Sequence, residues 1–247
     1  MSDTIPFGLG HFSVRIALAL SGAALTHIAL TPPTPPAQQS AVNKFGQPDV
    51  GTRIGRKYSV LMLPLYWILT VCEVTAILAS HYPSTTSTRL LAILAPHSAT
   101  SALNIRITHI VIVGWALTCL GSLLRLLCFR TLGRFFTFEL SLQEGHKLVT
   151  WGPYAVVRHP SYTGTLMVAS GNLLYAFGAG SWWKECGLAF TSVGELIALL
   201  RLISFLSFFV SVPVRIAKED RIFRKEFGAE WDAWARKTPN KLIPFVY

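Results

Sequence analysis

Residues 107–127 read ITHIVIVGWALTCLGSLLRLL, an apolar stretch in which Arg125 is the single Lys, Arg, Asp or Glu. A helix needs about 20 apolar residues, each rising about 1.5 Å, to cross a hydrocarbon core of about 30 Å. This stretch meets that length, so it predicts a membrane-spanning helix.

Four further apolar stretches have a similar length: 12–30, 58–80, 162–178 and 186–212. The second contains Pro64, which neighbouring helices can accommodate, and Glu73, whose charge should face protein rather than lipid. A polar hinge is expected at 83–104, and a short turn at 178–181 predicts that the last two stretches form a helical hairpin. We therefore expect an all-α integral membrane protein with about five transmembrane helices. A signal peptide is the alternative for the first stretch, because Arg15 precedes its apolar run.

The composition of the 247 residues agrees with a membrane protein. Charged residues make up 14%, against about 25% in soluble domains, and the mean hydropathy is +0.46. The four cysteines have no paired spacing, so we expect no disulfide scaffold. We also expect no metal, because no metal-ligand spacing is shown by His11, His27, His81, His97 and His109. A net charge of +10 suits nucleic acid or a membrane surface, and the apolar content favours the membrane, with no nucleic-acid partner.

The distribution of Lys and Arg predicts the orientation. With five spans, 17 of them fall on one side, in 31–57, in 125–161 and from Arg215 onward. The other side has only Arg89, Arg106 and Lys184. Cytoplasmic loops are enriched in Lys and Arg, so the rich side and the C-terminus should be cytosolic.

Two polar segments lie on this cytosolic side. Residues 139–162 read ELSLQEGHKLVTWGPYAVVRHPSY and could be a basic loop that contacts lipid phosphates. After a helix break expected at Pro213, an apolar face recurs near helical spacing, which predicts an amphipathic helix at the membrane interface, bent or split at Gly228. That face comprises Ile216, Phe223, Phe227, Trp231 and Trp234. Arg215 and Glu219 lie one turn apart and could be a solvated ion pair.

The order of these motifs is more specific than either segment. Residues 158–164, RHPSYTG, are followed by Glu219-Asp220 and then by 227–231, FGAEW, and they are preceded by 146–154, HKLVTWGPY. Over about the last 110 residues this order resembles the isoprenylcysteine carboxyl methyltransferase family, whose signature is R-H-P-S-Y-x-G with an acidic pair one hairpin downstream. The chain departs from the eukaryotic pattern in having Glu-Asp for Glu-Glu, and in having Trp231 and Trp234 where tyrosines are usual.

The resemblance implies an enzyme that methylates the α-carboxylate of a C-terminal prenylated cysteine in CaaX-processed proteins such as small GTPases, in the endoplasmic reticulum membrane. It implies a cytosolic pocket for S-adenosyl-L-methionine, with contacts at Glu139, His146, Lys147, Leu148, Val149, Tyr154, His159, Pro160, Ser161, Tyr162 and Glu219. Arg215 is expected to bind the acceptor carboxylate, with Arg158 as the alternative ligand. The expected catalytic residues are Arg215, Glu219 and Arg158. We expect one membrane domain over 1–247, with N-terminal transmembrane helices in 12–130 and the methyltransferase core in 131–247.

These residue types suit the reaction. A prenylcysteine carboxylate is ionised at neutral pH, so its attack on a sulfonium methyl needs alignment rather than a general base. An arginine can hold that carboxylate in a fork without losing its own proton. Two alternatives stay open, namely a membrane methyltransferase acting on another lipid such as phosphatidylethanolamine, and a non-catalytic membrane scaffold.

Overall fold

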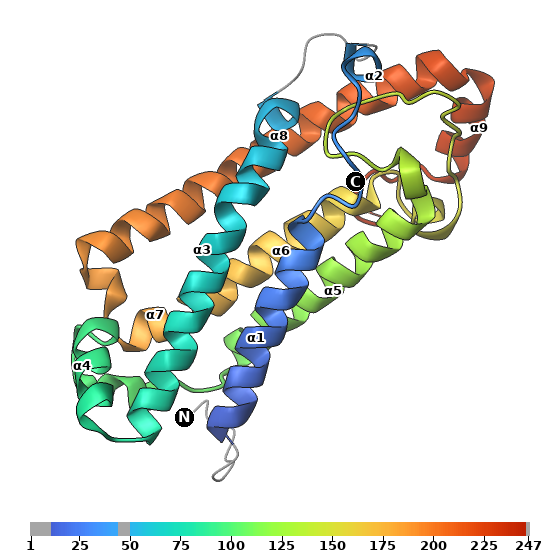
Figure 1. Ribbon diagram of the computed structural model, residues 1–247. Coiled ribbons are helices and arrows are strands. Elements are labelled where there is room, and N and C mark those ends of the chain that lie inside the picture. Colours follow the sequence, from blue (N-terminus) through green and yellow to red (C-terminus); the bar gives the residue numbers. More distant parts are fainter. Residues whose placement is uncertain (1–10, 44–49, 246–247) are drawn as a thin grey trace. The chain divides into compact units, whose positions relative to one another are not determined.

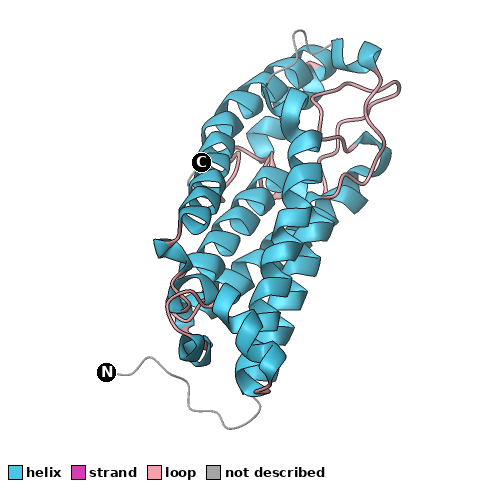
Figure 2. Ribbon diagram, turned by 60° about the vertical axis from the view of Figure 1, so that its left-hand side comes forward, coloured by secondary structure: helices cyan, strands magenta, loops and turns pink. Residues whose placement is uncertain are grey.

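The computed structural model describes residues 11–43 and 50–245, and these contain helices, turns and loops but no strand (Figures 1 and 2). The long helices are α1 (His11–Leu30), α3 (Val50–His81), α5 (His109–Leu132), α6 (Pro160–Phe177) and α8 (Ser192–Phe227). The short α-helices are α2 (Gln39–Asn43), α4 (Thr85–Leu94), α7 (Trp182–Glu185) and α9 (Ala229–Lys237). The 3-10 helices are η1 (Ala99–Asn104), η2 (Gly133–Phe135), η3 (Gly152–Ala155) and η4 (Leu188–Phe190). The prediction of an all-α protein is confirmed.

Four helical segments of the described chain are long and apolar enough to cross a membrane: Phe12–Leu30, Ser59–His81, His109–Phe135 and Ser192–Phe227. The helix expected at 162–178 does form, as α6, but it is not among these four. Its first turns, PSYTGT at 160–165, are polar and lower the apolar content of an 18-residue helix. The count of five membrane-spanning helices therefore remains a prediction.

Two expected connections are different in the structure. Residues 83–104 are mostly helical, in α4 and η1, rather than a polar hinge. The turn expected at 178–181 extends to residue 191 and contains α7 and η4, so α8 begins at Ser192 instead of 186. Local capping explains the second difference, because the hydroxyl of Ser181 accepts the N–H of Lys184 and that of Thr191 accepts the N–H of Gly194.

Pro213 does not break the last long helix, contrary to the sequence prediction. α8 continues through it to Phe227, and the chain turns at Gly228, which has a φ of +53°. The exposed proline lies close to Val212 and Ile216, which are 1% and 0% exposed. Packing on this buried side holds the helix together across the backbone hydrogen bond that proline cannot donate.

The chain divides into two compact units, both built from segments of the long helices. The first comprises, among the described residues, 11–27, 63–119 and 168–205. Here Glu73 is buried and lies 2.5 Å from Arg15, whose guanidinium stacks 4.3 Å from the centre of the Tyr175 ring. The prediction that Glu73 faces protein is confirmed.

The second unit comprises 28–62, 120–167 and 206–245 of the described chain. Trp231 and Trp234 of α9 are buried in a cluster with Cys128, Phe136 and Tyr154. The apolar face expected to lie in the membrane interface is therefore largely covered by the protein itself. The sequence predicted the spacing of this apolar face correctly but not what covers it. A helix face that packs against protein and one that packs against lipid carry the same apolar side chains.

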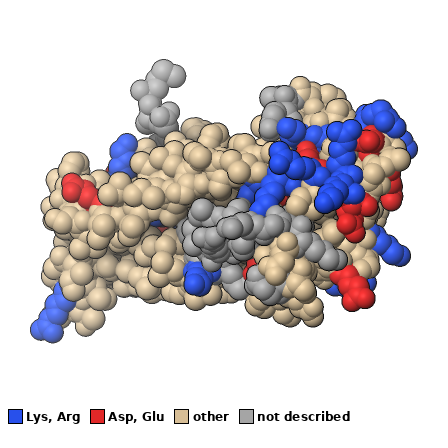
Figure 3. Space-filling view, turned by 90° about the horizontal axis from the view of Figure 1, so that it is seen from above, with Lys and Arg blue, Asp and Glu red and all other residues tan. Residues whose placement is uncertain are grey.

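Figure 3 shows Lys and Arg gathered on part of one face, with Asp and Glu among them. Exposed basic side chains of the second unit include Arg224, Lys225, Arg236 and Lys237. Three arginines counted above as loop charges are buried instead, namely Arg125, Arg158 and Arg215. Removing these three from the 17 leaves 14 against three, so the charge bias keeps its direction.

Candidate functional site

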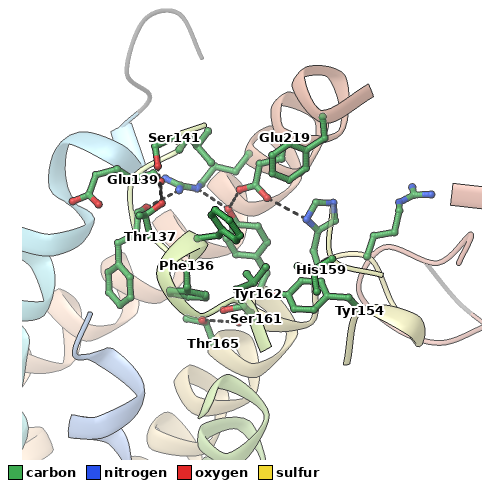
Figure 4. A pocket seen from close by; sticks show the side chains of 18 of the residues that line it. Phe136, Thr137, Glu139, Ser141, Tyr154, His159, Ser161, Tyr162, Thr165 and Glu219 are labelled. Atoms are coloured by element: carbon green, nitrogen blue, oxygen red, sulfur yellow. Dashed lines mark hydrogen bonds and ion pairs between the residues drawn. The ribbon is translucent and has the colours of Figure 1, made fainter. Parts of the chain in front are cut away.

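The second unit contains a cavity of about 240 Å³ (Figure 4). Its wall is formed mainly by the C-terminal part of α5, the loop that follows it, the first turns of α6 and the C-terminal half of α8. Polar and charged side chains from all four of these elements line it. Those used below are Arg125 of α5, His146 of the loop, His159, Ser161, Tyr162 and Thr165 at the start of α6, and Arg215 and Glu219 of α8.

His159 lies between the two acidic residues of α8. Its Nδ1 is 3.2 Å from Oε2 of Glu219, and its Nε2 is 3.0 Å from Oδ1 of Asp220. Burial alone lowers the pKa of His159, but the hydrogen bonds to Asp220 and Glu219 outweigh burial and raise it. Both ring nitrogens face carboxylate oxygens, an arrangement that favours the protonated imidazolium.

Tyr162 connects the arginine and the carboxylate of α8. Its hydroxyl accepts a hydrogen bond from Nε of Arg215 at 3.0 Å and donates one to Oε1 of Glu219. Figure 4 shows His159, Tyr162 and Glu219 pointing toward one another. Arg215 is only 7% exposed and also donates to the Phe138 carbonyl at 2.9 Å. The alternative of a solvated ion pair between Arg215 and Glu219 is therefore wrong.

Arg158 is buried and belongs to the same network. Its Nη2 lies 3.3 Å from Oδ2 of Asp220, and its guanidinium lies 5.6 Å from the centre of the Trp231 ring. The backbone N–H groups of Arg158 and His159 donate to the carbonyls of Asn240 and Lys241 at 3.0 and 2.8 Å. Arg158 is thus held by protein groups, which does not fit a loop that contacts lipid phosphates.

His146 forms an aromatic wall of the cavity. Its ring centre lies 4.7 Å from that of Phe135, 5.6 Å from Phe223 and 6.1 Å from Phe227. Burial lowers the pKa of His146 to about 4, so the ring is neutral at pH 7. Its Nδ1 is buried and has no hydrogen-bond partner among the described residues. Buried polar atoms are usually paired, so this nitrogen is a candidate contact for a ligand.

The predicted site residues converge in this cavity. All of them line it except Pro160, which begins α6 beside it. Other residues of the cavity wall were not expected from the sequence, among them Arg125, Thr137, Phe138 and Thr165. The position of Arg125 could have been recognised from the sequence. A single charged residue inside an apolar stretch is energetically unfavourable in a membrane and is often functional.

Comparison with known proteins confirms the resemblance for the part of the chain that carries these residues. Residues 113–224 match the Isoprenylcysteine carboxyl methyltransferase (ICMT) family. Protein-S-isoprenylcysteine O-methyltransferase B of Arabidopsis thaliana is 32% identical over 139 residues, covering 54% of this chain and 58% of that protein. A probable protein-S-isoprenylcysteine O-methyltransferase of Oryza sativa subsp. japonica is 32% identical over 136 residues, covering 54% of this chain and 61% of that protein.

A relative with a different activity also matches. A delta(14)-sterol reductase of Mus musculus is 26% identical over 103 residues, which cover 42% of this chain and 20% of that protein. The chain thus matches only about three fifths of the length of the two methyltransferases and a fifth of the reductase.

Proposed function

We propose that this chain transfers a methyl group from S-adenosyl-L-methionine to the α-carboxylate of a C-terminal prenylated cysteine. One observation carries the proposal, namely the network in which His159 and Tyr162 of the RHPSY motif hold Glu219, while Tyr162 also binds Arg215. These four residues lie within residues 113–224, which match the family, and they line one cavity.

The residues of the cavity fit an adenosyl and amino-acid cofactor. His146 with its neighbouring phenylalanine rings offers flat apolar surface for a purine, and its unpaired Nδ1 can accept a hydrogen bond. Glu219 can accept hydrogen bonds from amino or hydroxyl groups. When bound, the cofactor supplies an electrophilic methyl group on a sulfonium. Lys147, Leu148, Val149 and Tyr154 are the further proposed contacts in the loop before α6, and Glu139, His159, Pro160, Ser161 and Tyr162 complete the set.

Arg215 is the proposed ligand of the acceptor carboxylate. Its guanidinium is fixed by the Tyr162 hydroxyl and the Phe138 carbonyl, so little side-chain entropy remains to be lost when an acceptor binds. A fixed fork holds one carboxylate in a defined direction, which aligns its oxygen with the methyl group. Arg158 is already paired with Asp220, and this contact favours a positioning role for it over carboxylate binding.

The proposal includes the membrane topology. α6 would cross as a fifth helix, with the cavity and the C-terminus in the cytosol and the endoplasmic reticulum as the expected membrane. The exposed apolar side chains of α8, such as Leu199, Leu206 and Val210, would then face lipid or the prenyl chain. CaaX-processed proteins such as prenylated small GTPases would be the acceptors, and 131–247 would hold the catalytic core of one membrane domain.

Methyl transfer in nanodiscs tests the proposal. Purified chain, tritiated S-adenosyl-L-methionine and N-acetyl-S-farnesylcysteine should give a product whose label is released as methanol by base, because methyl esters hydrolyse under these conditions and N-methyl groups do not. N-acetylcysteine without the prenyl group is the control and should stay unlabelled. Base-stable label in phosphatidylethanolamine would favour the lipid methyltransferase instead. No binding of the cofactor would favour a scaffold.

A further inference from the structure

Arg125 is a buried cation in α5 that the proposed mechanism does not use. It is 5% exposed, and its Nε donates to the carbonyl of Ala29 at 2.7 Å. Its Nη1 donates to the hydroxyl of Ser161 at 3.1 Å and to that of Thr165. Ser161 and Thr165 lie one turn apart at the start of α6 and are drawn side by side in Figure 4.

The charge of Arg125 has no anionic partner. No carboxylate of the described chain forms an ion pair with it, whereas Arg158 in the same unit has Asp220. Its surroundings are instead the rings of Phe129 and Phe138, at 5.1 and 5.4 Å from the guanidinium carbon. Burying an ion without a counter-ion is costly, and within a helix that can cross a membrane such a residue is a candidate for function.

The unpaired side of this guanidinium is available to a ligand. Arg125 lines the cavity, and its Nη2 makes no hydrogen bond with any described residue. The side chain is not completely enclosed by protein, because 5% of Arg125 stays exposed. The guanidinium lies at the first turn of α6, where the helix dipole adds positive potential.

We propose that Arg125, with Ser161 and Thr165, forms a carboxylate-binding subsite in the cavity. The inference rests on the proposed function, whose two reactants each carry a carboxylate, one on the methionine part of the cofactor and one on the acceptor. Arg215 is placed to hold one of these anions, and Arg125 supplies a second cation for the other. The bound carboxylate is the counter-ion that Arg125 lacks.

Paired ligands that differ in the carboxylate test this subsite. Binding is measured for S-adenosylhomocysteine and for 5′-methylthioadenosine, which lacks the amino-acid part. Inhibition or turnover is measured for N-acetyl-S-farnesylcysteine and for its carboxamide. In Arg125→Gln, the preference for the carboxylate ligand should fall at least ten-fold in one of the two pairs. The affected pair identifies which carboxylate the subsite holds.

Arg201→Gln is the matched control in the first unit. Arg201 is also buried, lies 5.0 Å from the Tyr66 ring centre and donates to the Asn172 carbonyl, but it does not line the cavity. Both preferences should stay unchanged in this control.

If both preferences stay within two-fold in folded Arg125→Gln, the subsite is wrong and Arg125 only joins helices. If Arg125→Gln does not fold, Arg125→Lys replaces it in the same measurements. Lysine lacks the planar guanidinium, so the preference for the carboxylate ligand should fall at least three-fold in one of the two pairs. Unchanged preferences in both pairs would overturn the subsite. Wild-type protein that binds neither nucleoside would overturn the proposed function itself, independently of the variants.

Discussion

Glu219 accepts hydrogen bonds from Tyr162 and His159 and faces the cavity, so it should contribute directly to cofactor affinity. We expect Glu219→Ala to weaken S-adenosyl-L-methionine binding by about 1.5–3 kcal/mol, roughly ten-fold or more. Isothermal titration in detergent measures this. Glu226→Ala is the control, because Glu226 is exposed on the same helix and should leave affinity unchanged. Equal affinities in the two folded variants would contradict the role of Glu219.

His159 should make the stability of the protein depend on pH. Its pKa is raised in the folded protein by hydrogen bonds to Asp220 and Glu219, which outweigh burial. The free energy by which protonated His159 stabilises the folded protein is therefore fully present below the pKa of about 6.5 in the unfolded chain. It is lost as pH rises through the higher pKa of His159 in the folded protein. In Asp220→Asn this loss should be smaller and should be complete at a lower pH, because removing one of the two carboxylates lowers the folded pKa of His159 toward its unfolded value.

The melting temperature as a function of pH checks this. His159→Gln is the control and should lack the transition altogether. A pH profile of Asp220→Asn that coincides with that of the wild type would show that Asp220 does not hold the imidazolium.

Arg215 separates acceptor binding from cofactor binding. We expect Arg215→Ala to leave cofactor affinity within a few-fold, while kcat/KM for N-acetyl-S-farnesylcysteine falls by at least 100-fold, about 2.7 kcal/mol, because alignment is lost. Arg215→Lys should recover little, since lysine lacks the planar fork. Both quantities are measured in one nanodisc preparation. Loss of cofactor binding with normal acceptor turnover would reverse the roles given to Arg215 and Glu219.

Twelve of the 27 residues that line the cavity could be predicted, because they lie in or near motifs whose order along the chain is known. His159 and Glu219 are 60 positions apart, yet the family resemblance places them together and the structure brings them within 3.2 Å. Arg125 was not predicted as a site residue, because an arginine near the end of an apolar stretch can equally belong to the next loop. Only its packing against Ser161 and Thr165 shows that it is inside.

In the first unit, α5 and α6 pack closely where Gly114 of α5 faces Gly171 of α6. A Cβ on Gly171 would lie 2.5 Å from the Gly114 carbonyl, and one on Gly114 would lie 2.6 Å from the Tyr175 nitrogen. Since these contacts are backbone atoms, Gly171→Ala must push the helices apart. We expect a loss of about 1–3 kcal/mol of stability, measured as a lower melting temperature.

Gly22→Ala is the matched control for this contact. Gly22 also lies within a helix, but its added Cβ would be 3.6 Å from a Trp115 side-chain atom, an ordinary contact distance. The control should melt at or slightly above the wild-type temperature, because alanine is the better helix former. If Gly171→Ala has the same melting temperature as Gly22→Ala, the close approach of α5 and α6 is not required for stability.

The elements also show where sequence patterns stop being informative. The lengths of the apolar stretches predicted the positions of α1, α3 and α5 well, because the thickness of the bilayer sets the length of a membrane-spanning helix. The end of α8 was predicted wrongly, since Pro213 is exposed and its neighbours are anchored by packing that a local rule does not include. The start of α8 depended on the side-chain cap at Thr191 rather than on hydropathy.

At the scale of the whole molecule, the proposed chemistry requires a particular orientation in the membrane. S-adenosyl-L-methionine and CaaX-processed proteins are cytosolic, so the loop before α6 and the C-terminal part of α8 must be reachable from the cytosol. The 14 Lys and Arg that are not among the three buried residues still lie in the segments assigned to that side, against three on the other. This balance depends on α6 crossing the membrane, because without it the loop before α6 and the C-terminus would lie on opposite sides.

Inserted glycosylation acceptors test this crossing. An acceptor placed at Ser84–Thr88, at the start of α4, should be modified in microsomes, because the connection between α3 and α5 is assigned to the lumen. An acceptor near Gln143, or one added after Lys237, should stay unmodified. The C-terminal acceptor is the informative one, since it becomes luminal if α8 crosses and α6 does not. Modification at Gln143 alone would overturn the orientation, and modification after Lys237 would remove α6 from the membrane-spanning set.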